Sequence, residues 1–137
     1  MARRRPLRPL GDDEYGRLAR FRYALRRFLR FSEDAARRAG ISPAQYQLLL
    51  FVRGFPGPAP TIAVLAERLQ VTHHSAVGLV DRTARLGLVR RVKDAVDARR
   101  VRVELSARGA TVLQRLVRAH SPEVDRLSAA LFRVPTR

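Results

Sequence analysis

The sequence predicts a mainly α-helical protein that carries one small β-ribbon, and three observations lead to this prediction. Apolar residues recur at helical spacing in two short segments, residues 61–69 and 72–83, which only two residues separate. Two strand-like segments, residues 88–93 and 100–105, come next. Longer helical segments lie on both sides of this unit. Because helix, turn, helix and ribbon is the order of a winged helix-turn-helix domain, we expect such a domain between N- and C-terminal helices.

The length and composition indicate a single globular domain. The chain has 137 residues and a hydrophobic content of 46%, enough for a core of its own. It has no cysteine, which excludes a disulfide framework, a thiolate metal site and a thiol redox switch. No segment approaches the roughly 20 apolar residues of a membrane span, and the N-terminus lacks the apolar core of a signal peptide. We therefore expect a cytoplasmic protein with no membrane partner.

The charge balance indicates a polyanionic partner. Lys and Arg number 28 against 12 Asp and Glu, a formal net charge of +16. Such a balance favours nucleic acid first and an acidic membrane second. The basic residues are spread along the chain, so composition does not locate a binding face. A genome rich in arginine codons explains part of the bias equally well.

The terminal regions predict an arm and two sets of packing helices. Residues 1–11 hold two prolines and four arginines without periodicity, which is typical of a flexible basic arm. Residues 12–137 form the single domain. Within it, residues 12–40 begin with three acids, as a helix N-terminus favours, and are apolar on more than one side. Because one chain of this size supplies too few partners for that helix, we expect it to pack against a second subunit together with residues 106–133.

Several boundaries follow from capping residues and prolines. Ser42 and Pro43 have the N-cap and N1 residue types, and the helix that they begin places four apolar residues in the core: Tyr46, Leu49, Leu50 and Val52. Residues 54–60 predict a rigid loop without an extended hydrogen-bonding role. Ser106 is expected to cap a further helix. The Ser121-Pro122 pair is expected to break that helix and to begin a last one.

The segment after Thr72 has the features of a helix that enters a DNA groove. Thr72 is a hydroxyl N-cap, and its helix has one apolar face, formed by Ala76, Leu79, Val80 and Thr83. The opposite face has short and mostly uncharged side chains, although the chain is strongly basic. A helix in the major groove needs such a low surface, with a few donors and methyl groups that reach base edges.

The chain resembles the MarR family, the multiple-antibiotic-resistance regulators of bacteria. The resemblance runs in family order over about residues 13 to 133 and is carried by Ile41-Ser-Pro-Ala-Gln-Tyr-Gln-Leu-Leu49, Leu65-Ala-Glu-Arg-Leu69, Leu79-Val-Asp-Arg82 with Gly87-Leu-Val89, and Asp97-Ala-Arg99 followed by Val103-Glu-Leu-Ser106 and Gly109. It implies a winged helix-turn-helix fold and dimerisation through residues 12–40 and 106–133. It also implies that Arg99 enters a minor groove, where narrow A·T-rich segments concentrate negative potential. Asp97 would brace the tip by pairing with Arg99 or by capping the turn.

The candidate DNA-binding residues lie in the second short helix and in the ribbon. They are Thr72, His73, His74, Ser75, Val77, Gly78, Arg82, Asp97, Arg99 and Arg100. The imidazoles are able to donate to a phosphate or a purine acceptor, and the alternative is two exposed polar residues without a role. Where the family often has a polar residue and then Arg or Lys, this chain has Val77 and Gly78. That departure lowers the expected number of hydrogen bonds to bases, although Val77 is able to meet a thymine methyl.

The resemblance also implies a pocket for a small aromatic or phenolic acid. Four aromatic residues lie on suitable helices, namely Tyr23, Phe28, Tyr46 and Phe51, and the alternative is that they are plain core. A metal site is not expected, since the only imidazoles are His73, His74 and His120 and they do not converge. No catalytic motif appears, so we expect neither an enzyme nor a cofactor.

The function that we predict is a dimeric, sequence-specific DNA-binding transcriptional regulator. By resemblance it is a repressor that a small aromatic ligand releases from a pseudo-palindromic operator in double-stranded DNA. The alternative is a non-specific architectural DNA- or RNA-binding basic protein, for which charge suffices. A third hypothesis, an enzyme that acts on nucleic acid, lacks a visible catalytic set.

Overall fold

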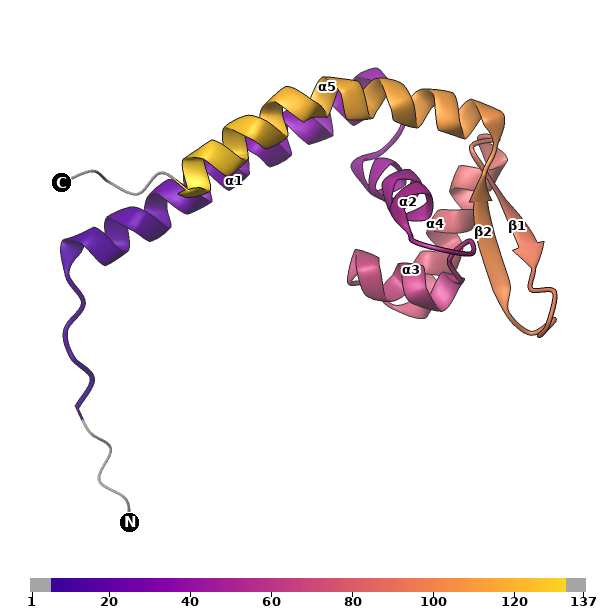
Figure 1. Ribbon diagram of the computed structural model, residues 1–137, viewed down its shortest axis with the longest axis horizontal. Helices are drawn as coiled ribbons and strands as arrows, with labels where there is room; N and C mark the ends of the chain where they lie inside the picture. Colours follow the sequence, from indigo (N-terminus) through magenta and orange to yellow (C-terminus); the bar gives the residue numbers. More distant parts are fainter. Residues whose placement is uncertain (1–5, 133–137) are drawn as a thin grey trace, which may run out of the picture.

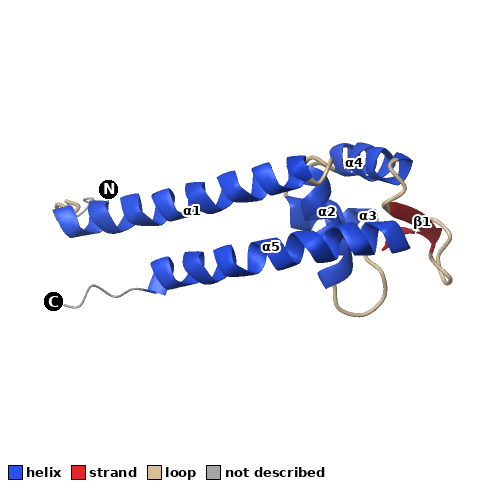
Figure 2. Cartoon of the chain, turned by 90° about the horizontal axis from the view of Figure 1, so that it is seen from above, coloured by secondary structure: helices blue, strands red, loops and turns tan. Residues whose placement is uncertain are grey.

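The computed structural model describes residues 6–132, which form five helices and one two-stranded sheet. In chain order they are α1 (Asp12–Arg38), α2 (Pro43–Gly54), α3 (Ile62–Leu69), α4 (His73–Arg85), β1 (Val89–Lys93), β2 (Val101–Leu105) and α5 (Ala107–Phe132). The mainly helical fold with a small β-wing is confirmed. Figure 1 shows α1 and α5 side by side in opposite directions, extending away from a cluster of α2, α3, α4 and the two strands. Figure 2 shows the same arrangement from above.

Local capping starts the helices of the cluster where the sequence indicates. The Ser42 hydroxyl accepts from Gln45 N–H at 3.1 Å and the Gln45 side chain accepts from Ser42 N–H at 2.9 Å, which makes a capping box. The core of the cluster takes large side chains from all three of its helices and from β2. Fully buried are Leu48 and Leu49 of α2, Leu65 of α3, Val80 of α4 and Val103 of β2. Of the four residues expected in the core of α2, Leu50 is only half-buried.

The wing, residues 89–105, is an antiparallel hairpin in which Val89 pairs with Leu105 and Lys93 with Val101. Gly87 enters it from α4 with φ +74°, a conformation that favours glycine. The loop of residues 54–60, which was expected to have no extended hydrogen-bonding role, bonds to the wing at its C-terminal end. The Pro60 carbonyl accepts from Val103 N–H at 2.9 Å, and the next residue, Thr61, forms an isolated antiparallel bridge with Arg102 of β2.

α5 is one continuous helix, so the expected break at Ser121-Pro122 was wrong. Pro122 has no N–H to donate, a loss that costs about 3 kcal/mol in a helix interior. The helix nevertheless continues through Pro122, and packing of α5 along α1 offsets this cost. Ser121 Oγ donates to the Val117 carbonyl at 3.0 Å.

His120 was missed as a structural residue, since the sequence suggested only a neighbour of a helix break. Its side chain is 3% exposed, and its ring stacks on Tyr46 with 4.6 Å between centroids. Nδ1 lies 2.6 Å from the Leu116 carbonyl oxygen, which only accepts, so Nδ1 carries a proton. Nε2 lies 2.9 Å from Ser32 Oγ. His120 thus links α5 to α1 and α2.

Replacing His120 by alanine is expected to lower the free energy of unfolding by about 2 kcal/mol, because it opens a cavity beside Tyr46 and leaves Ser32 without its partner. Denaturant unfolding at fixed protein concentration measures this. The matched control is Gln114→Ala, at an exposed position of the same helix, which should change stability by less than about 0.5 kcal/mol. Equal stabilities of the two variants would contradict a structural role for His120.

The predicted basic arm lies partly outside the described residues, which exclude 1–5 and also 133–137. Its described part, residues 6–11, is exposed and has no helix or strand. Asp12 begins α1, as expected. Within residues 6–132, none of the helices combines the length and the apolar character that a membrane crossing requires.

Candidate nucleic-acid interface

α3 and α4 form a tight helix-turn-helix unit. α3 ends at Leu69, and Gln70 adopts the left-handed conformation with φ +56°. Its N–H donates to Glu67 O at 3.0 Å, and Val71 N–H donates to Ala66 O at 3.0 Å. This reversal uses the two turn residues that the sequence predicts. It brings Thr72 to the N-cap of α4, where its hydroxyl accepts from Ser75 N–H at 3.1 Å.

α4 buries the face that the sequence predicts and leaves the opposite face open. The buried residues are Ala76, Leu79, Val80 and Thr83. On the other side Thr72, His73, His74 and Ser75 are exposed, whereas Val77 and Gly78 are half-buried. Within the described residues, these four positions form no side-chain hydrogen bond with another element; the bonds between Thr72 and Ser75 stay within the turn. The first turn of α4 is therefore available to a partner. In the described range no three His, Cys, Asp or Glu side chains come close enough to hold a metal ion.

Gly78 makes room for Arg82 on this face. A Cβ at Gly78 would lie 3.1 Å from Nη1 of Arg82, so the guanidinium lies back along the helix over the glycine. Position 78, where the family often has a polar or basic residue, is therefore covered by the side chain of Arg82 from the next turn of the helix. Arg82 is exposed and has no ion pair among the described residues.

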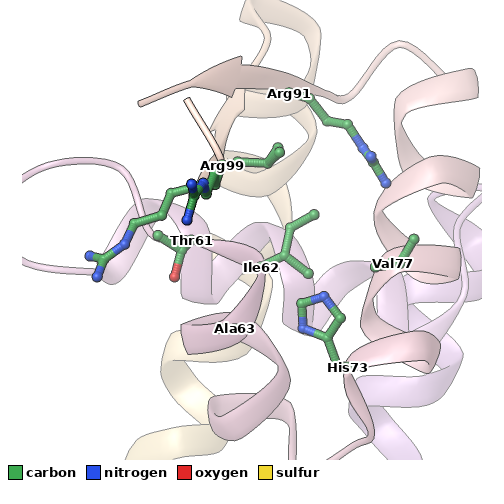
Figure 3. A pocket seen from close by; sticks show the side chains of 9 residues that line it. Thr61, Ile62, Ala63, His73, Val77, Arg91 and Arg99 are labelled. Carbon is green, nitrogen blue, oxygen red and sulfur yellow. The ribbon is translucent and has the colours of Figure 1, made fainter. Parts of the chain in front are cut away.

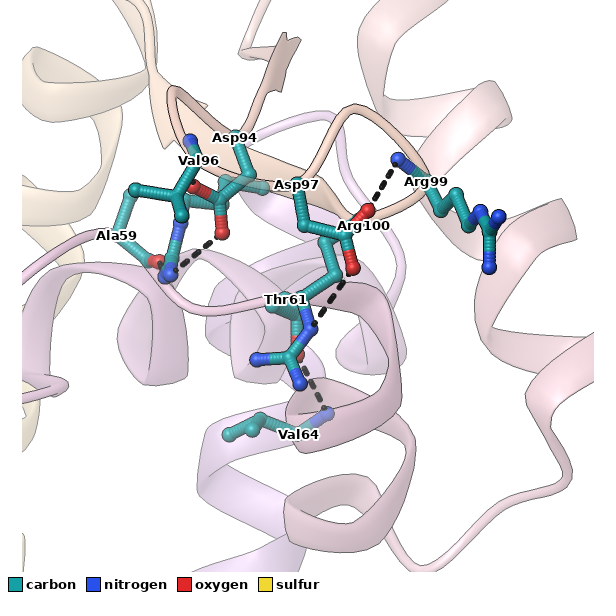
Figure 4. Close-up of polar contacts among 9 residues, drawn as sticks. Ala59, Thr61, Val64, Asp94, Val96, Asp97, Arg99 and Arg100 are labelled. Carbon is teal, nitrogen blue, oxygen red and sulfur yellow. Dashed lines mark hydrogen bonds and ion pairs between the residues drawn. The ribbon is translucent and has the colours of Figure 1, made fainter.

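The wing tip is ordered by Asp97. Of the two roles expected for this residue, the turn cap is the one observed: Asp97 Oδ1 accepts from Arg99 N–H at 3.0 Å. Its other oxygen lies 3.9 Å from Nε of Arg100. Figure 4 shows the Arg99 side chain directed away from this carboxylate. Arg99 is exposed and forms no ion pair within the part of the chain that is described, so its charge is available.

Asp81 has a structural role, because it pairs with a residue of another element. Its carboxylate is 2.6 Å from Nη2 of Arg91, which joins α4 to β1. The sequence does not reveal this pair, since residues ten positions apart on different elements show no periodic relation. Arg90 pairs with Glu104 across the hairpin at 3.1 Å. Both arginines therefore form ion pairs within the fold.

A groove of about 540 Å³ separates α4 from the wing (Figure 3). Its lining residues are Thr61, Ile62 and Ala63 at the start of α3, His73 and Val77 of α4, and Arg91, Arg99, Arg100 and Val101 of the wing. The groove brings His73, Val77, Arg99 and Arg100 together from among the predicted DNA-binding residues. It adds the first turn of α3, which the sequence analysis did not single out. We call it the α4–wing groove.

The four candidate pocket residues do not line one cavity. Tyr46 is buried against His120, and the Phe28 ring meets the same imidazole edge to face at 6.2 Å. Phe51 packs against the core. Tyr23 is exposed and lines an open depression of about 420 Å³ on α1.

Comparisons with known proteins agree with this architecture. The sequence profile of the MarR family matches residues 39–100, from the end of α1 through most of the wing. AbsC, a MarR family transcriptional regulator from Streptomyces coelicolor, is similar with a TM-score of 0.76 and 20% identity, over 94% of this chain and 86% of that one. Wild-type MarR from E. coli gives a TM-score of 0.70 and 22% identity, over 94% and 89%.

MepR from S. aureus, in a complex with DNA, gives a TM-score of 0.71 and 20% identity, over 82% of each chain. No curated protein sequence is significantly similar to this chain. At such identities the solved structures establish the fold, and the profile match covers the helix-turn-helix unit and the wing tip. Residues 39–100 thus match the MarR family, and the whole chain has the fold of MarR-like winged helix-turn-helix proteins.

Proposed function

We propose that this protein is a homodimer that binds a pseudo-palindromic operator in double-stranded DNA and represses transcription until a small aromatic ligand releases it. The observation that carries the DNA-binding part is the pairing of an uncovered first turn of α4 with an unpaired Arg99 across one groove. The crystallisation of the similar S. aureus protein with DNA supports the proposal.

In this proposal each surface contacts a separate part of the duplex. α4 enters the major groove by its first turn, where His73, His74 and Ser75 present donors and Val77 presents methyl groups. Arg99 enters the adjacent minor groove. The strand between these two grooves then lies in the α4–wing groove, where Arg100 and the first turn of α3 meet its phosphates.

Exposed apolar side chains on α1 and α5 support the homodimer. Tyr15 is 63% exposed, Leu18 61% and Phe132 81%, on helices that already pack together. Large apolar side chains exposed on a pair of packed helices are typical of an interaction surface. Two copies related by a twofold axis would present two α4 helices to half-sites about 34 Å apart, whereas one copy reads only a few base pairs. The same surface is the one that the family resemblance assigns to dimerisation.

Sedimentation at micromolar concentration is expected to give a dimer. Leu18→Asp should weaken dimerisation about 100-fold, because it removes from each subunit a leucine that the dimer would bury. The control is Leu7→Asp, at a position that is 96% exposed and precedes α1, which should leave the dimer intact. A wild-type protein that sediments as a monomer would contradict the proposed homodimer.

The ligand part of the proposal rests on the family resemblance, since the four candidate aromatic residues do not line one cavity within the subunit. Binding between subunits would change the spacing of the two α4 helices and cost operator affinity, a coupling of typically 1 to 3 kcal/mol. Titration with salicylate and related phenolic acids is expected to raise the melting temperature and to weaken DNA binding. A panel of such acids without either effect would remove this effector class and leave DNA binding untouched.

Selection of genomic DNA fragments by the purified protein tests the specific function. The selected site should bind at least about 10³ times more tightly than bulk DNA at physiological salt. A ratio near one would favour the second candidate, an architectural DNA- or RNA-binding protein, which the net charge of +16 supports.

A further inference from the structure

Arg102 of β2 connects the wing to the loop that precedes α3. Its Nη1 donates to the Ala59 carbonyl at 2.6 Å, and its Nη2 lies 3.0 Å from Oδ2 of Asp94. The side chains are 26% and 11% exposed for Arg102 and Asp94, the least exposed ion pair in the described range. One planar guanidinium therefore holds two segments at once, which suits its fork of donors.

Asp94 is itself held in place, so Arg102 has a fixed acceptor. Val96 N–H donates to Asp94 Oδ1 at 3.0 Å, and Asp94 N–H donates to Arg100 O at 3.0 Å. The hydrogen bond from Val96, and then Arg102, hold the pKa of Asp94 below its ordinary value despite some burial. The carboxylate stays ionised throughout the neutral range, and the ion pair persists with it.

The backbone continues the same connection. Thr61 pairs with Arg102 in an antiparallel bridge, and Val103 N–H donates to Pro60 O at 2.9 Å. Thr61 is the N-cap of α3, since its hydroxyl accepts from Val64 N–H at 3.3 Å. The segment that Arg102 holds is thus continuous with the first helix of the helix-turn-helix unit. A rotation of the wing about its base has to break these bonds.

The other arginines of the wing act differently. Arg90 and Arg100 form exposed pairs with residues of the wing itself, at 3.1 and 3.9 Å. Arg91 reaches α4 from β1. Arg102 holds the second strand, the one that leads directly from the tip back to the core. It anchors the wing on the side of Arg99.

We propose that Arg102 is a positioning residue for DNA reading: it fixes the angle of the wing to the helix-turn-helix unit, so that Arg99 reaches the minor groove while α4 occupies the major groove. This inference rests on the proposed function and assigns part of the specificity to a residue that touches no DNA. Arg102 acts through Arg99, which makes a definite prediction for combined substitutions.

A double-mutant cycle tests this coupling. Arg102→Ala is expected to weaken binding to the selected DNA site about tenfold when Arg99 is present, and less than about twofold when Arg99 is already alanine. A residue that supports only the stability of the fold would give equal losses in both backgrounds. Such additivity, or full affinity in Arg102→Ala, would overturn the proposal. Arg90→Ala is the matched control, because it removes the same charge from the same hairpin, and it should change affinity less than about twofold in both backgrounds.

Hydrogen exchange tests, in the absence of DNA, whether Arg102 holds the wing to the loop that precedes α3. The amide of Val103, which is bonded to Pro60, should exchange at least about tenfold faster in Arg102→Ala than in wild type or in Arg90→Ala. Unchanged exchange would overturn the anchoring role. If the wild-type protein shows no preferred DNA site, the proposed function fails, and this exchange result still decides whether Arg102 fixes the wing.

Discussion

Replacing Gly109 by alanine is expected to lower the free energy of unfolding by about 3 kcal/mol, with a fall in melting temperature on the order of 10 °C. A Cβ at this position would overlap the carbonyl oxygen of Leu88 and lie 2.9 Å from its carbonyl carbon. These are backbone atoms, so no rotamer change relieves the clash. Ser106, just before α5, is bonded to the same residue, which immediately precedes β1: its N–H donates to Leu88 O at 3.0 Å. The start of α5 and the start of β1 would have to separate.

The control is Gly78→Ala, another glycine within a helix. Its added Cβ would meet only the end of the Arg82 side chain, which is able to move. Alanine is also the better helix former, so this variant should be as stable as wild type or about 0.5 to 1 kcal/mol more stable. Thermal unfolding of both variants at one protein concentration makes the comparison. A Gly109→Ala protein with the same melting temperature as the wild type would disprove the close contact between α5 and the start of β1.

Replacing Arg99 by alanine is expected to weaken operator binding by about 1 to 3 kcal/mol in each half-site, a factor of about 5 to 160 for each. The side chain is exposed at the wing tip, and its backbone N–H, not its guanidinium, is the group that Asp97 holds. The lost interaction is therefore with DNA, and folding should be unaffected. Binding titrations with the selected site and with bulk DNA measure the change, which should be larger for the selected site.

Two further variants separate the guanidinium from the charge. Arg99→Lys keeps the charge but has no planar fork, so it should restore only part of the affinity. Arg115→Ala removes the same charge from an exposed position of α5, away from the α4–wing groove, and should lower affinity for all DNA alike by a small factor. If Arg115→Ala and Arg99→Ala behave alike, Arg99 contributes only to the overall charge.

Local sequence signals predicted the elements that position the candidate site. Thr61 and Thr72 are hydroxyl N-caps whose effect is confined to one helical turn, and the buried face of α4 follows from its spacing alone. The position of Gln70 in the turn was predicted, but its left-handed conformation was not, because glycine is the usual residue there.

What the sequence did not reveal depends on contacts between distant residues. The Asp81–Arg91 pair and the bonds from Arg102 to Ala59 join segments whose proximity appears only after folding. At Pro122 a local signal was present but misleading. Proline predicts a helix end, yet packing along α1 keeps α5 continuous. His120 has no local signal for burial, because its environment comes from α1 and α2.

Hydroxyl-radical footprinting on the selected DNA site tests most directly whether α4 and the Arg99 tip are presented twice to one face of the duplex. We expect two protected regions related by the symmetry of the site and centred about one helical turn, or 34 Å, apart, each flanked by minor-groove protection that Arg99→Ala abolishes. A single asymmetric region, or flanking protection that persists in Arg99→Ala, would contradict this arrangement.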